Sequence, residues 1–145
     1  MTIAANSFSH VRLTVTDIDR SREFYERLFG WPIAFEVPPG ADEATREQFA
    51  FLFGGVLYQL GDGSLLGLRP VANDTFDENR VGLDHLSFAV GSVADLHAAA
   101  ALLDEHGVPH EPVKDIRAAY LLEFRDPDNI QLELWWTRPR TATES

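Results

Sequence analysis

Three polar side chains on apolar stretches have the residue types of a metal site. His10 lies in Ser-Phe-Ser-His-Val-Arg-Leu-Thr-Val, His85 in Gly-Leu-Asp-His-Leu-Ser-Phe-Ala-Val, and Glu133 in Asn-Ile-Gln-Leu-Glu-Leu-Trp-Trp. Side chains alternate between the two faces of a strand, so each polar residue is expected to lie opposite its apolar neighbours. Two imidazoles and one carboxylate suit Fe(II), Mn(II), Co(II) or Zn(II) and leave positions open for water or substrate. We therefore predict one divalent metal at His10, His85 and Glu133.

Arg12 and Glu123 are the side chains that we expect to take part in chemistry beside the metal. Arg12 follows His10 by two residues and shares its strand face, where a guanidinium can bind a carboxylate, an enolate or a phosphate. A salt bridge to an acidic neighbour is its alternative role. Glu123 is a candidate general base if its strand face looks into the cavity, and otherwise a solvated carboxylate.

Two further residues are candidates for substrate binding. Trp135 shares the face of Glu133 and offers an aromatic wall for a pocket. Gln59 can orient a substrate, although its position also suits an ordinary surface residue. The remaining histidines are interpreted as structural or solvated residues: His97, His106 and His110.

The first half of the chain reads strand, helix and three strands. Asp17 is expected to cap the helix and Gly30 to end it. The charged stretch 41–48 is expected to be a loop or a single helical turn. The expected elements are a strand at 8–15, a helix ending at Phe29, a strand at 33–37 and a hairpin of 56–60 with 64–69.

The second half repeats this order. Ser92 is expected to start its helix and Gly107 to stop it. The spacing from the histidine to the glycine is 20 residues in the first half and 22 in the second. Aligning the hairpins places Gly67 where the second half has Glu133. The expected strands are 83–90, 108–112, 120–125 and 130–136, and the chain divides into a first module at 8–70, a linker at 71–82, a second module at 83–137 and a frayed tail at 138–145.

Composition excludes several classes of partner. Twelve Lys and Arg against 23 Asp and Glu give a formal net charge of −11, which repels nucleic acids and anionic membranes. The absence of cysteine restricts any metal to nitrogen and oxygen ligands. We see neither a secretory signal nor an apolar run of membrane-spanning length, and we expect a cytoplasmic protein.

The motifs resemble those of the vicinal oxygen chelate superfamily, which includes glyoxalase I, bleomycin and fosfomycin resistance proteins and extradiol dioxygenases. The resemblance rests on His-x-x-Leu-x-Val-x-Asp, Ser-x-x-Phe-Tyr-x-x-x-Phe-Gly, Asp-His-Leu-Ser-Phe-x-Val and Phe-Arg-Asp-Pro-Asp-Asn-Ile-Gln-Leu-Glu. It implies an α+β fold of two βαβββ modules, whose curved mixed sheets form a metal-centred cavity that a second subunit often completes. It assigns His10, His85 and Glu133 to the family's ligand positions and implies a homodimer that binds a small molecule with adjacent oxygens.

Departures from the family patterns leave several activities open. Gly67 stands where glyoxalase I has a fourth ligand, which disfavours that reaction. Glu123 stands where extradiol dioxygenases have a tyrosine, and Lys114 to Ala119 lacks the loop of the fosfomycin transferases. We expect a dioxygenase-like oxygenase with Fe(II) as first choice and Mn, Co, Ni or Zn as alternatives. The other readings are a redox-neutral lyase or isomerase and a protein that sequesters a drug or metabolite.

Overall fold

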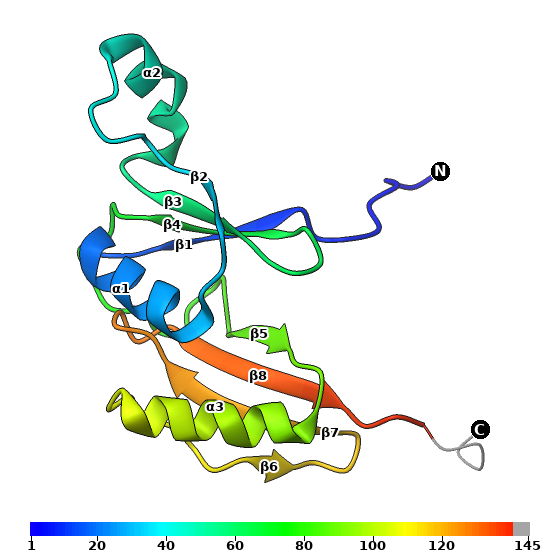
Figure 1. Cartoon of the computed structure of the whole chain (residues 1–145). Coiled ribbons are helices and arrows are strands. Elements are labelled where there is room, and N and C mark those ends of the chain that lie inside the picture. The colour runs from blue at the N-terminus through cyan, green and yellow to red at the C-terminus, as the bar shows by residue number, and fades with distance from the viewer. Residues whose placement is uncertain (141–145) are drawn as a thin grey trace. The chain divides into compact units, whose positions relative to one another are not determined.

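The computed structural model describes residues 1–140, which divide into two compact units at residues 1–74 and 75–140. Each unit contains one four-stranded mixed sheet and a long helix on one face of it (Figure 1). The predicted α+β fold of two βαβββ-like modules is therefore confirmed. The units are described one at a time below.

The sheet of the first unit has the strand order β1-β4-β3-β2, with β1 parallel to β4 and the other pairs antiparallel. Alternation separates two faces: Leu13, Leu66 and Leu68 are buried on one, and Arg12 lies opposite Gly67 on the other. The elements are β1 (His10–Thr14), α1 (Ile18–Phe29), β2 (Ile33–Phe35), α2 (Glu43–Gln48), η1 (Ala50–Leu52), β3 (Val56–Gln59) and β4 (Leu65–Arg69).

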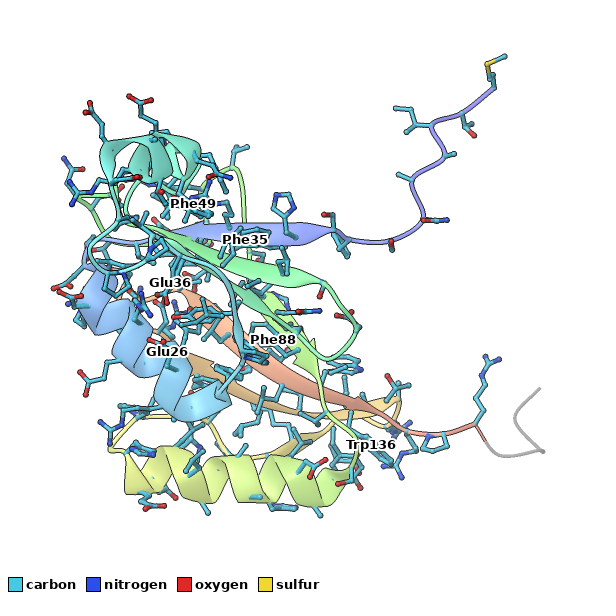
Figure 2. The ribbon with its side chains drawn as sticks, turned by 45° about the horizontal axis from the view of Figure 1, so that its top comes forward. Glu26, Phe35, Glu36, Phe49, Phe88 and Trp136 are labelled. Carbon is cyan, nitrogen blue, oxygen red and sulfur yellow. The ribbon has the colours of Figure 1, made fainter. Side chains whose placement is uncertain are left out.

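Helix α1 begins and ends where its capping residues predict. The Asp17 side chain accepts a hydrogen bond from the Arg20 amide, and Gly30 closes the helix with φ 63°. Arg22 on this helix pairs with Glu26 at 3.2 Å and with Glu36 at 3.0 Å; both glutamates are labelled in Figure 2. These ion pairs connect α1 to the chain that follows β2.

The charged stretch 41–48 contains more regular structure than a single turn. Asp42 accepts a hydrogen bond from the Thr45 amide and caps the six-residue helix α2. The 3₁₀ turn η1 follows directly and buries Leu52. This segment supplies the two carbonyl groups that Arg12 contacts, as described below.

The sheet of the second unit has the equivalent order β5-β8-β7-β6, with β5 parallel to β8. Its apolar face carries Leu122, Phe124, Leu132 and Leu134, all buried. Helix α3 starts at the predicted cap, where the Ser92 hydroxyl accepts from the Asp95 amide. The elements are β5 (Leu86–Ala89), α3 (Val93–Glu105), β6 (Lys114–Asp115), β7 (Ala119–Arg125) and β8 (Gln131–Thr137).

Two strand predictions in this unit are corrected. The strand expected at 83–90 starts only at Leu86, so His85 lies immediately before β5. The strand expected at 108–112 is reduced to one bridge between His110 and Phe124. Pro109 and Pro112 flank that bridge, and neither can donate to a ladder. Pairing with β7 resumes at β6, beyond the second proline.

The turn between β7 and β8 holds residues of the expected linker. Asp126 accepts hydrogen bonds from the amides of Asp128 and Ile130, both at 2.9 Å. The Phe76 amide donates to the Asp128 carbonyl at 3.2 Å, and Arg125 pairs with Glu78 at 2.6 Å. This part of the 71–82 segment is thus fixed to the second unit.

The expected frayed tail, 138–145, begins with a residue that is well held. Arg138 donates from Nε to the Arg117 carbonyl at 2.7 Å, and its guanidinium pairs with Asp115 at 3.1 Å. Residues 141–145 of that tail lie outside the described residues. Between residues 1 and 140, no helix combines the length and the apolar character needed to cross a membrane.

His110 is expected to stabilise the second unit more strongly when it is protonated than when it is neutral. Its Nδ1 lies 2.7 Å from the Glu111 carbonyl oxygen and its Nε2 lies 2.9 Å from Asp104. Both nitrogens can donate only in the imidazolium, so these two acceptors raise the pKa of His110 above its ordinary value of 6.5. The stabilisation is complete below about pH 6.5 and is lost as pH rises through the raised pKa.

Urea unfolding between pH 6 and pH 9 tests this prediction. The wild type is expected to lose more stability over this interval than His110→Gln, because the variant lacks the titrating ring. Parallel pH profiles for the two proteins would contradict the assignment.

Candidate metal site

The face of the second sheet opposite its apolar core brings polar residues together. On neighbouring strands, Glu133 of β8 pairs with Ser87 of β5 on one side and with Glu123 of β7 on the other. His85 precedes β5 by one residue and shares the parity of Ser87. Strand register therefore places the two carboxylates on one face, and the short distance from the His85 ring to Glu133 places the imidazole beside them.

His85 and Glu133 have the geometry of a ligand pair. Their Nε2 and Oε1 atoms are 3.7 Å apart, too far for a hydrogen bond. Two donors that each lie about 2.1 Å from a shared ion are at most about 4.2 Å apart, so this spacing accommodates one. Glu133 is only 6% exposed, and a carboxylate that is buried without full pairing carries a large desolvation cost. The residues present thus fit a divalent cation.

The ring of His85 is held on its other side by Asp84, whose Oδ1 is in hydrogen-bond contact with Nδ1. This hydrogen bond, together with the negative charges of Glu133 and Glu123, raises the pKa of His85, while burial opposes the shift. A raised pKa means that protons compete more strongly with a cation for the ring.

His10 is the first residue of β1 and lies in the first unit. It is exposed, and its Nδ1 lies 3.0 Å from the hydroxyl oxygen of Ser9. Within residues 1–140, no group of three or more histidine, aspartate or glutamate side chains is close enough together to hold a metal. His85 and Glu133 are therefore the predicted ligands that lie side by side in the structure.

Glu123 faces Glu133 directly across the β7–β8 pair. Its Oε2 lies 3.5 Å from the ammonium group of Lys114, and its side chain is about one-third exposed. Like charges opposite one another on a sheet repel, and a cation between or beside them relieves that repulsion. Strand register thus places Glu123 on the face of Glu133, and its role as a general base stays a prediction.

Arg12 contacts the protein backbone rather than an acidic neighbour. Its Nη1 and Nη2 donate to the carbonyl oxygens of Phe51 at 2.9 Å and Leu52 at 3.1 Å. Its side chain crosses Gly67, where a Cβ atom would lie 2.8 Å from the arginine Cγ. The glycine thus provides the space for Arg12, and the guanidinium stabilises η1. Its proposed substrate contact stays a prediction.

The two predicted substrate-binding residues belong to different units. Gln59 is the exposed last residue of β3 and shares the face of Arg12. Trp135 lies on β8 with the parity of Glu133, opposite Leu121, and its Nε1 donates to the Thr137 hydroxyl at 3.0 Å. Their roles in binding stay predictions.

Sequence reasoning missed two residues beside this site. Asp84 contacts His85, and the adjacent Asp-His pair in the sequence could have indicated this contact. Lys114 reaches Glu123 from β6. Nothing in its local sequence indicates that contact, because the two residues meet only through strand pairing.

A family model described as the glyoxalase/bleomycin resistance protein/dioxygenase superfamily matches residues 7–134. The chain therefore belongs to this superfamily, as its motifs predict. A comparison with curated proteins finds no match.

Solved structures share the fold over nearly the whole chain. A glyoxylase/bleomycin resistance protein/dioxygenase domain from Frankia sp. EAN1pec is 32% identical, with a TM-score of 0.76, and the alignment covers 93% of this chain and 100% of that one. A glyoxalase/dioxygenase from Nostoc punctiforme is 22% identical, with a TM-score of 0.73 and coverages of 96% and 99%. A lactoylglutathione lyase from Agrobacterium tumefaciens is 17% identical, with a TM-score of 0.66 and coverages of 92% and 96%. At these low identities, the structures from Nostoc punctiforme and Agrobacterium tumefaciens show only that the fold is shared.

Proposed function

We propose that the protein is a divalent-metal-dependent enzyme acting on a small organic substrate with adjacent oxygen atoms. The observation that carries this proposal is the buried Glu133 facing His85 at 3.7 Å. His10 is the third ligand in this proposal, supplied by the same chain or by a second copy in a homodimer. A metal held there would stabilise negative charge that develops on a substrate oxygen.

The first subclass that we propose is an oxygenase. Two histidines and one carboxylate form the donor set that non-haem Fe(II) oxygenases use. Trp135 lies on the Glu133 face and would border an aromatic substrate. Arg12 and Gln59, on the corresponding face of the first unit, are proposed to contact the polar groups of the substrate.

A redox-neutral lyase or isomerase is the second candidate, and the placement of Glu123 favours it. This carboxylate lies opposite Glu133, where it can accept a proton from a carbon next to a substrate carbonyl. Lys114 lies 3.5 Å from this carboxylate and helps to hold it in place. Proton transfer needs no oxygen, so oxygen consumption separates the two candidates.

Elemental analysis of protein purified without an affinity tag tests the proposal. We expect about one metal per subunit, lost in His10→Ala. Iron, followed by oxygen uptake with catechol-like substrates, would support the oxygenase, whereas Zn, Ni, Co or Mn without oxygen uptake would support the lyase or isomerase. No metal after reconstitution would overturn both candidates in favour of a sequestering protein.

A further inference from the structure

Both candidate histidine ligands are held through the same ring nitrogen by the residue that precedes them. The Nδ1 atom of His10 contacts the hydroxyl of Ser9 at 3.0 Å, and the Nδ1 atom of His85 contacts the carboxylate of Asp84. In both cases Nε2 is left for another partner. For His85 that nitrogen lies on the side of Glu133.

We propose that Asp84 is a positioning residue that fixes the His85 ring with its proton on Nδ1 and its Nε2 lone pair available beside Glu133. The inference rests on the proposed metal-dependent function. It assigns to the chain a residue that acts on the metal through His85.

Asp84 and Ser9 form different kinds of hydrogen bond, so they orient His85 and His10 to different degrees. An ionised carboxylate only accepts hydrogen bonds, so Asp84 requires a proton on Nδ1 of His85. A hydroxyl donates or accepts, so Ser9 does not select a tautomer of His10. A carboxylate behind a metal-binding histidine also makes the ring a stronger donor. His85 is therefore the better oriented of the two ligands.

The solvent exposure of Asp84 indicates that this residue orients the His85 ring rather than supporting the fold. Its side chain is 80% exposed, and its hydrogen bond goes to the ring of His85. Replacement of an exposed side chain away from the core is expected to leave the protein folded. Effects on the ring and on metal affinity can thus be measured in a folded protein.

A second aspartate–histidine pair offers a matched control. Asp104, on α3, accepts a hydrogen bond from Nε2 of His110 at 2.9 Å. Like Asp84, it is an exposed carboxylate that pairs with a histidine, but that histidine is not a candidate ligand. Asp104→Asn removes a similar charge without touching His85.

Ring nitrogen NMR of the metal-free protein tests the orientation directly. Above its titration range, His85 is expected to carry its proton on Nδ1 in the wild type. The amide of Asp84→Asn can donate or accept, so this variant should keep the proton on Nδ1 less completely than the wild type. In Asp84→Ala a substantial share of the proton should move to Nε2. An unchanged tautomer in Asp84→Ala would overturn the assignment even if the protein binds no metal.

Titration with Co²⁺ alone tests the consequence for binding. Asp84→Ala should weaken Co²⁺ affinity about 10- to 100-fold and change its visible absorption spectrum, Asp84→Asn should restore part of the loss, and Ser9→Ala should have a smaller effect. Asp104→Asn should match the wild type. Equal affinities for Asp84→Ala and wild type would overturn the inference, whereas a wild type that binds no Co²⁺ would overturn the proposed function.

Discussion

Glu133→Gln is expected to abolish metal binding while making the metal-free protein more stable. In the metal-free state, at a pH where His85 is neutral, Glu133 is buried and lies opposite Glu123, so desolvation and like-charge repulsion both oppose folding. A neutral amide of the same shape removes both costs, with an expected gain of about 1 kcal/mol. If Glu133 only supported the fold, the same substitution would instead lower the stability of the metal-free protein.

Denaturant unfolding with and without added Co²⁺ measures both effects. The wild type should gain about 2.7 kcal/mol when free Co²⁺ is 100 times its dissociation constant, and Glu133→Gln should gain nothing. Glu123→Gln is the matched control, because it relieves the same repulsion but should keep the Co²⁺-dependent gain. Destabilisation of metal-free Glu133→Gln would contradict the interpretation of Glu133 as a ligand.

Gly67→Ala is expected to destabilise the first unit by about 1–3 kcal/mol. A Cβ atom at this position would lie 2.3 Å from Cδ2 of Leu57 and 2.8 Å from Cγ of Arg12. Leu57 is buried, and the Arg12 guanidinium is bonded to η1, so neither side chain can move without losing contacts. Gly67→Glu should for the same reason fail to provide the fourth ligand of a glyoxalase I site.

Unfolding measurements on two glycine variants check this expectation. Gly61 has open space around its missing Cβ, so Gly61→Ala should stay within about 0.5 kcal/mol of the wild type. Combining Gly67→Ala with Arg12→Ala should cost less than the sum of the single changes, because the two residues share the same space. Additive losses, or a Gly67→Ala variant as stable as Gly61→Ala, would refute the packing explanation.

Local signals made much of the fold predictable. Asp17, Gly30 and Ser92 mark helix ends because capping hydrogen bonds and positive φ depend on neighbouring residues. The internal repeat also indicated that Gly67 and Glu133 occupy equivalent positions. The strand register confirms this, because Gly67 pairs with Arg12 as Glu133 pairs with Ser87.

The bounds of two expected strands in the second unit were wrong, because strand pairing did not follow the apolar pattern of the sequence. The apolar alternation around His85 suggested a longer strand, but pairing with β8 begins only at Leu86. The segment from Val108 to Pro112 also looked extended, yet its prolines leave a single bridge. Apolar pattern reports which residues are buried, whereas hydrogen bonding with a neighbouring strand decides where a strand starts.

The sequence by itself determined the superfamily and its two-module fold through the resemblance of its motifs, and it determined the helix ends and the residue types of the candidate site, because caps and spacing are local properties of the chain. Only the tertiary structure decided which side chains meet. It placed Glu123 opposite Glu133, Lys114 beside Glu123, and Arg12 on the carbonyl groups of η1. The Arg12 contacts join residues far apart in the chain and depend on the space left by Gly67. The contacts of Glu123 depend on the exact register of β6, β7 and β8, which the apolar pattern alone does not fix.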